Sequence, residues 1–142
     1  MQKVLLTIKG TQLESGNNDR VEFVTEGRLF RNADGYLLEY DESELTGVDG
    51  CTTKLILKDG SVTLLRSGGS DMHMIFSPHS VYESSLSTPA GNMRLSIFAM
   101  RVESQLTEKS GSLSLEYELS LGDLSTVNKL DLSFKNVEDC IN

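Results

Sequence analysis

Residues 112–121 alternate strictly between apolar and polar side chains. Leu113, Leu115 and Tyr117 share one parity with two further leucines, while serine and glutamate fill the other parity. Successive side chains of a β-strand point to opposite faces of the sheet, so this alternation predicts a strand with one buried and one solvated face. A Gly-Asp break and a second alternating run at 130–134 extend the prediction to a two-strand unit.

The same alternation recurs along most of the chain. An Asp59-Gly60 turn between two alternating runs is the strongest local hairpin signal. Gly27 predicts a bend or a bulge within its strand. In 93–106 the apolar parity slips near Ala99 to Arg101, so we interpret this segment as a long strand with a bulge, although a helix could also use its consecutive apolar residues. The predicted strands are 2–13, 20–31, 36–40, 52–58, 61–67, 72–76, 80–87, 93–106, 112–121 and 130–134.

These strands predict an all-β fold in a single domain spanning residues 1–142. Short loops and the lack of a convincing helix favour an antiparallel meander. An open sheet of about ten strands would leave two unpaired edges, so we predict closure, complete or nearly so, into an up-and-down barrel, with a two-sheet β-sandwich as the alternative. The bulky inward side chains either line a ligand-sized cavity or fill the barrel. They are Phe23, Tyr36, Tyr40, Met72, Met74, Phe76, Tyr117 and Phe134.

The net charge of the chain limits the classes of molecule that we expect it to bind. The chain has 13 Lys and Arg against 21 Asp and Glu, a net charge of -8. Such a surface repels nucleic acids and anionic lipids, so we expect neither as a partner. The densest acidic run is predicted to form a solvated strand end and turn. It consists of Glu39, Asp41, Glu42 and Glu44.

The cysteines and the lack of targeting signals indicate a cytoplasmic location. Cys51 and Cys140 are too few and too far apart for a disulfide scaffold, and we expect them not to pair. The N-terminus alternates like a strand rather than forming the apolar run of a secretory signal. No segment reaches the roughly 20 apolar residues of a membrane-spanning helix.

Catalytic and metal-binding motifs are nearly absent. The two histidines, His73 and His79, cannot form an HExxH motif, and the parity of His73 predicts an outward side chain. No GxSxG elbow accompanies the many serines. We therefore expect no enzymatic activity, no metal and no cofactor.

Arg66 is the most informative polar residue. Its parity matches Val62 and Leu64, which places the guanidinium on the apolar face near a strand end. There it either binds a ligand carboxylate or phosphate, extends to water, or pairs with an internal carboxylate. Thr53 and Tyr117 share inward parities and complete the candidate ligand-binding set.

Five short segments stand out by their order and spacing along the chain. They are Thr52-Thr53-Lys54-Leu55, Arg66-Ser67-Gly68, Met74-Ile75-Phe76, Thr88-Pro89-Ala90-Gly91-Asn92-Met93-Arg94-Leu95 and Leu115-Glu116-Tyr117-Glu118-Leu119. Together they resemble the YwiB-like family of small uncharacterised bacterial β-barrel proteins. The resemblance implies a calycin-like barrel, related in architecture to lipocalins and fatty-acid-binding proteins, and no established activity.

Two functional hypotheses follow. The first is a cytoplasmic, non-enzymatic barrel that binds a small, partly apolar anionic or lipid-like molecule in its interior. The second is a protein-interaction or scaffold module that uses its acidic exterior or an unpaired strand edge and has no small-molecule ligand. The sequence leaves the oligomeric state open.

Overall fold

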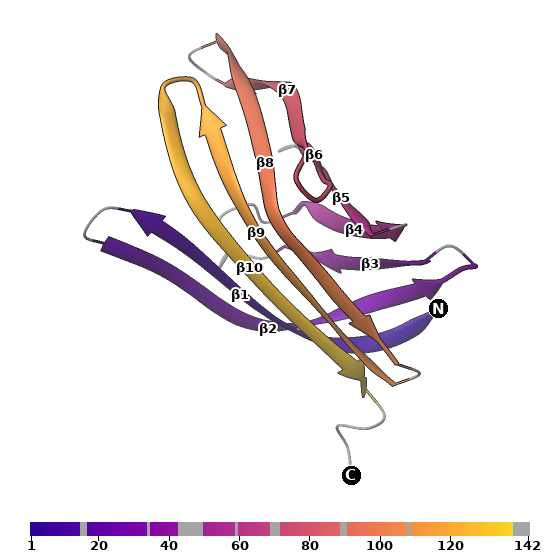
Figure 1. The fold of residues 1–142 in the computed structure, drawn as a ribbon. Helices are drawn as coiled ribbons and strands as arrows, with labels where there is room; N and C mark the ends of the chain where they lie inside the picture. Colours follow the sequence, from indigo (N-terminus) through magenta and orange to yellow (C-terminus); the bar gives the residue numbers. More distant parts are fainter. Residues whose placement is uncertain are drawn as a thin grey trace.

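A computed structural model describes residues 1–14, 17–33, 35–42, 50–58, 60–68, 72–88, 91–107 and 109–137. These residues form ten β-strands (Figure 1). In chain order the strands are β1 (Gln2–Glu14), β2 (Asn17–Arg31), β3 (Gly35–Asp41), β4 (Thr52–Lys58), β5 (Ser61–Ser67), β6 (Met72–Phe76), β7 (Val81–Thr88), β8 (Gly91–Leu106), β9 (Ser110–Leu121) and β10 (Leu124–Asn136).

All ten strands belong to one antiparallel sheet that curls into a nearly closed barrel. Their spatial order is β6-β5-β4-β3-β2-β1-β10-β9-β8-β7. The first and last strands pair in a long ladder from Val4↔Asn136 to Leu13↔Val127. The predicted barrel is confirmed, and the sandwich alternative is not adopted.

One feature of the predicted meander is wrong, because β6 and β7 are consecutive but not paired. They form the two edges of the sheet, so the seam of the barrel lies between them. After Ser77 the chain turns and bonds to β8, where the amide of His79 donates to the carbonyl of Ala99 at 2.9 Å. This docking directs β7 along β8. Side chains bridge the seam, with His73 Nδ1 2.7 Å from the Tyr82 hydroxyl.

The interior is filled by one continuous apolar core. The inward parities that the alternation predicts are buried in both halves of the barrel, including Leu6, Leu55 and Leu115. Of the predicted inner aromatic residues and methionines, Phe23, Met72 and Tyr117 are only partly buried and pack against this core. The middle of the barrel is therefore packed rather than hollow.

Two predicted irregularities have different outcomes. The bulge in β8 is confirmed, because the register with β9 shifts between Ala99 and Arg101. No bulge occurs at Gly27, where the ladder with β1 is continuous. A Cβ at Gly27 would lie 2.5 Å from Cδ1 of Leu6, so glycine provides room for a core leucine there.

The two ends of the barrel differ. Because neighbouring strands are antiparallel, the β1–β2, β3–β4, β5–β6, β7–β8 and β9–β10 connections all lie at one end, here called the β3–β4 end. The β1–β2 and β9–β10 hairpins splay apart there (Figure 1). Apolar side chains on them are solvent-exposed, with Leu124 at 71% and Val21 at 52%. Apolar side chains on these two hairpins are thus left uncovered at the β3–β4 end.

Candidate functional site

A row of cross-strand neighbours lines the interior near the β3–β4 end. Tyr40 is the register partner of Thr53, Thr53 of Arg66, and Arg66 of Met72, so four adjacent strands each contribute one side chain. The next row inward is entirely apolar and begins with Leu38. The polar row therefore forms the boundary between the core and the open end.

Glu42 joins this row from the residue after β3. Its parity is that of Leu38 and Tyr40, and its side chain is only 2% exposed. The Thr53 hydroxyl donates a hydrogen bond of 2.5 Å to Glu42 Oε1, and Arg66 Nη2 lies 3.8 Å from the same oxygen. We call Tyr40, Glu42, Thr53 and Arg66 the buried carboxylate cluster.

The surroundings of Tyr40 keep its hydroxyl protonated. Burial and, after it, the nearby Glu42 carboxylate raise the pKa of Tyr40 far above its ordinary value, since both oppose a second negative charge. Tyr40 is therefore a neutral hydrogen-bond donor beside Glu42 over the physiological range. The phenolate needed for nucleophilic chemistry is strongly disfavoured.

Arg66 retains hydrogen-bonding capacity inside this cluster. Its Nε is buried and has no hydrogen-bond partner among the described residues. Buried polar atoms in native proteins are nearly always hydrogen-bonded, so an unpaired guanidinium N–H marks a place where a further acceptor oxygen would be favourable. The Arg66 side chain is 20% exposed and can be reached from solvent.

The sequence prediction for Glu42 is wrong. It is buried, because the alternation Leu38, Tyr40, Glu42 continues inward past the end of β3. Its neighbours Glu39 and Asp41 do point outward, as expected, and Glu44 lies outside the described residues. Parity would have identified Glu42, but the density of acidic residues favoured a solvated turn.

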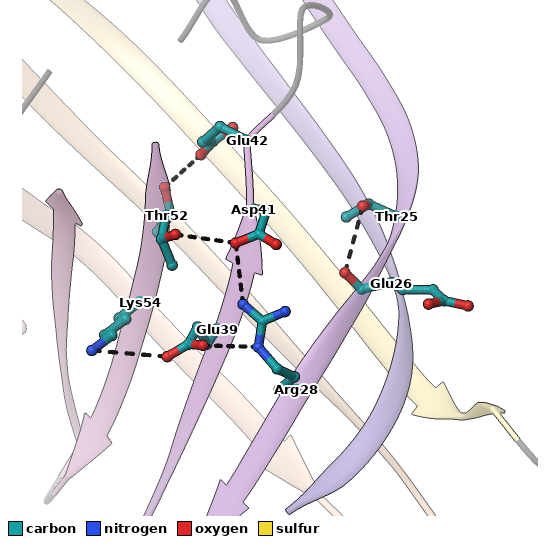
Figure 2. A network of polar contacts seen from close by, with 9 residues as sticks. Thr25, Glu26, Arg28, Glu39, Asp41, Glu42, Thr52 and Lys54 are labelled. Carbon is teal, nitrogen blue, oxygen red and sulfur yellow. Dashed lines mark hydrogen bonds and ion pairs between the residues drawn. The ribbon is translucent and has the colours of Figure 1, made fainter. Parts of the chain in front are cut away.

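The outward carboxylates form a separate ionic ladder on the outer face. Figure 2 shows Arg28 between Glu39 and Asp41, with Lys54 and Thr52 at the two ends. Hydrogen bonds from Arg28 and Thr52 lower the pKa of Asp41 below its ordinary value. The carboxylates of Glu39 and Asp41 on the outer face are thus exposed to solvent to different degrees, whereas that of Glu42 on the inner face is buried.

Tyr117 occupies a different part of the wall. It lies on β9, and its ring packs edge-on against Phe76 with centroids 4.8 Å apart. Together with Gly10, Asn128 and Leu130 it lines a depression of about 210 Å³ between β1, β2, β9 and β10. The structure therefore brings Arg66 and Thr53 together through Glu42, while Tyr117 packs against the core and lines the depression between β1, β2, β9 and β10.

Most of the chain matches the model of one protein family. A family model described as a domain of unknown function, DUF1934, matches residues 6–133. The chain belongs to the DUF1934 family. It is 26% identical over 121 residues to the uncharacterized β-barrel protein YwiB of Bacillus subtilis strain 168, covering 84% of this chain and 83% of that protein. The predicted YwiB-like resemblance is confirmed.

The fold of this DUF1934 member is also that of a solved structure. The crystal structure of the ywiB protein from Bacillus subtilis superposes with a TM-score of 0.82, covering 95% of this chain and 92% of that chain at 21% identity. This likeness establishes the barrel fold that the DUF1934 chain shares with YwiB.

Other parts of the DUF1934 barrel hold weaker candidates. An outer depression of about 330 Å³ lies across β1, β10, β9 and β8, but polar groups there bond one another: Ser114 donates to Asp131 at 2.7 Å and accepts from Arg101 at 3.0 Å. No cluster of three metal-ligating side chains occurs among the described residues.

Cys51 is buried with a free thiol. Its predicted lack of pairing with Cys140 is untested, because Cys140 lies outside the described residues.

The described residues include no helix with the length and apolar character needed to span a bilayer.

Tyr36, at the opposite end of the DUF1934 barrel, gives a test of the core. Its buried hydroxyl has no hydrogen-bond partner among the described residues, and burial raises the pKa of Tyr36 to about 12. Replacing it with phenylalanine removes an unsatisfied polar group, so Tyr36→Phe is expected to raise the free energy of unfolding by about 1 kcal/mol near neutral pH.

The same substitution changes the alkaline limb of the stability curve. Because the pKa of Tyr36 is raised in the folded state, the wild-type protein keeps the full contribution of this residue to the free energy of unfolding below pH 10.0. The contribution is lost as the pH rises toward about 12, because the tyrosine of the unfolded chain ionises first. Urea denaturation at about pH 8 and about pH 11 should show a smaller loss of stability for Tyr36→Phe than for the wild type. A variant that is less stable at the lower pH would contradict the unpaired state of the hydroxyl.

Proposed function

We propose that this barrel binds a small, partly apolar anionic molecule at its β3–β4 end, with Arg66 contacting the anionic group. The observation that carries the proposal is the buried Nε of Arg66, which lacks a hydrogen-bond partner among the described residues. An arginine presents fixed, parallel N–H groups that match a carboxylate or phosphate.

The surroundings of Arg66 support an amphipathic ligand. Met72 is its cross-strand partner and is only partly buried, so an apolar surface lies beside the guanidinium. Exposed Val21 and Leu124 add apolar area at the splayed end. Antiparallel barrels of eight or more strands can hold a small ligand, and the calycin-like resemblance favours ligand binding by analogy of fold.

In this proposal the protein binds its ligand without catalysing a reaction, and it does so in the cytoplasm. Tyr40 is held neutral, and the described partner of His73 is the phenol of Tyr82, so neither offers an activated nucleophile. The proposed cytoplasmic location rests on the two cysteines, which are too few and too far apart in sequence for a disulfide scaffold.

Native mass spectrometry of freshly purified protein tests the proposal. We expect an adduct of a few hundred daltons on the wild-type protein, the mass of a typical small-molecule ligand. The adduct should be lost in Arg66→Met and retained in Arg28→Met, which removes a matched arginine from the outer face. Recovery of wild-type protein without any adduct, from several expression hosts and growth conditions, would contradict the proposal.

A second candidate function rests on the seam. Strands β6 and β7 are unpaired edges, and such edges accept an added strand from a partner protein. Photo-crosslinking from Ser85, an exposed residue of β7, should then capture one reproducible partner that is not captured from Glu22 on β2. Capture of the same proteins from both positions would count against a docking role for the seam.

A further inference from the structure

We propose that Tyr40, Thr53 and Arg66 form a binding site for a carboxylate, and that Glu42 occupies this site in the free protein as an internal substitute for the carboxylate of a ligand. The inference rests on the proposed function and deepens it in two ways. It names the ligand class, a monocarboxylate with an apolar chain, and it assigns Glu42 as the group that the ligand displaces.

The donors of the cluster all converge on one carboxylate. Thr53 donates to Oε1 of Glu42, Arg66 faces the same oxygen, and the neutral hydroxyl of Tyr40 is hydrogen-bonded to the same carboxylate. These side chains come from three neighbouring strands whose register is fixed by the sheet. The site is therefore built for a carboxylate whether that group comes from the chain or from outside.

Charge balance requires exchange rather than addition. The cluster contains one cation, Arg66, and one anion, Glu42, both largely removed from solvent. A second anion beside Glu42 would place two negative charges against one guanidinium, which is unfavourable in a partly buried site. A monocarboxylate that replaces Glu42 keeps the charge unchanged, whereas a phosphate dianion does not.

The geometry gives an external carboxylate an advantage over Glu42. Glu42 approaches only Nη2 of Arg66, at 3.8 Å, and leaves Nε unpaired. A free carboxylate is not tethered to β3 and can accept from Nε and Nη2 together, the stronger two-bond arrangement. This difference supplies the free energy for displacement.

The backbone allows Glu42 to leave. Its amide donates to the carbonyl of Cys51 at 2.8 Å, which holds the main chain against β4 while the side chain rotates. Glu42 also stands at the β3–β4 end, one residue beyond the strand. Rotation of one side chain therefore opens the site without breaking the β3–β4 ladder.

Titration calorimetry with octanoate tests the inference on four proteins. These are the wild type, Glu42→Ala, Glu42→Gln and the double variant Glu42→Ala with Arg66→Met. Removing the internal competitor should strengthen octanoate binding to Glu42→Ala by about tenfold or more, a difference of the size that allosteric and competitive couplings commonly reach. Glu42→Gln should also bind more tightly, and the double variant should not bind. Octanol and octyl phosphate should bind Glu42→Ala more weakly than octanoate does.

A thermal-unfolding series provides the readout if Glu42→Ala is too unstable for calorimetry. Its unfolding midpoint should rise saturably with acetate or propionate and not with chloride at equal ionic strength, and Glu39→Ala, which removes an outer carboxylate, should show no such rise. Octanoate binding to both Glu42 variants no tighter than to the wild type, or a midpoint that responds equally to chloride, would overturn the inference.

The two proposals fail separately in these experiments. If the purified wild type carries a ligand that depends on Arg66 but the Glu42 variants bind octanoate no better, the proposed function stands and the role of Glu42 is wrong. If the wild type carries no ligand while the Glu42 variants bind octanoate through Arg66, the carboxylate site stands and the proposed function is wrong.

Discussion

Replacing Arg66 with methionine is expected to lower the free energy of unfolding by about 3 kcal/mol, because the substitution leaves Glu42 as an unpaired buried charge. The Glu42 side chain is 2% exposed, so water cannot take over the role of the guanidinium without local opening. Methionine keeps most of the side-chain volume, which limits the loss of packing. Urea denaturation at about pH 7 measures the change.

Two further variants separate charge from packing. Arg28→Met removes an arginine from the solvent-exposed outer ladder and should cost less than about 1 kcal/mol, since Asp41 there is 68% exposed. Adding Glu42→Gln to Arg66→Met removes the stranded charge and should recover much of the stability. Equal costs for Arg66→Met and Arg28→Met would show that the Glu42–Arg66 pair is not effectively buried.

Replacing Phe76 with alanine is expected to have a comparable or larger effect, about 3–5 kcal/mol, through the cavity that it leaves. Phe76 is 1% exposed and lies on β6, one of the two unpaired edges. Its ring contacts Tyr117 on β9, so it joins the edge of one half of the barrel to the wall of the other. Loss of this contact should destabilise the seam between β6 and β7 more than the rest of the barrel.

The seam effect has its own readout. Hydrogen exchange of amides in β6 should accelerate more in Phe76→Ala than exchange in β1, whose ladders on both sides are unchanged. Phe30→Ala, at a residue that is 40% exposed on β2, is the matched control and should cost about 1 kcal/mol or less. Uniform acceleration across all strands would indicate global destabilisation without a special role at the seam.

The local part of the fold could be predicted from the sequence. A side-chain period of two fixes which residues face inward, and the parity slip near Ala99 to Arg101 is the direct mark of the observed bulge. Gly27 was predicted to mark a bend or a bulge, but a glycine in a strand can also make room for a close neighbour, and only the position of Leu6 shows this.

The position of the seam in the barrel could not be predicted in the same way. Every consecutive pair except β6–β7 forms a ladder, and the exception depends on the Ser77–Ser80 turn bonding to β8. That contact joins residues far apart in the sequence, so no local signal at Ser77-Pro78 announces it. The pairing of β1 with β10 is non-local for the same reason.

The candidate site was predictable in its residues and not in its connections. Parity placed Arg66 and Thr53 inward, and their relation follows once the β4–β5 hairpin sets the register. Glu42 was predicted to be solvated, although the same parity indicates burial, and its role as the partner of Arg66 depends on where β3 ends beside β4. Tyr117 shares the inward parity yet packs on Phe76, because parity specifies a face and not a neighbour.

The central claim is that the β3–β4 end of the barrel binds an amphipathic anion through Arg66, and a ¹H–¹⁵N NMR titration of the wild-type protein with octanoate tests it most directly. We predict saturable shifts that are largest at Tyr40, Thr53, Arg66 and Met72, the register partners that form the polar row. Saturation with no shifts in this row, or shifts confined to the outer depression around Ser114 and Asp131, would contradict it.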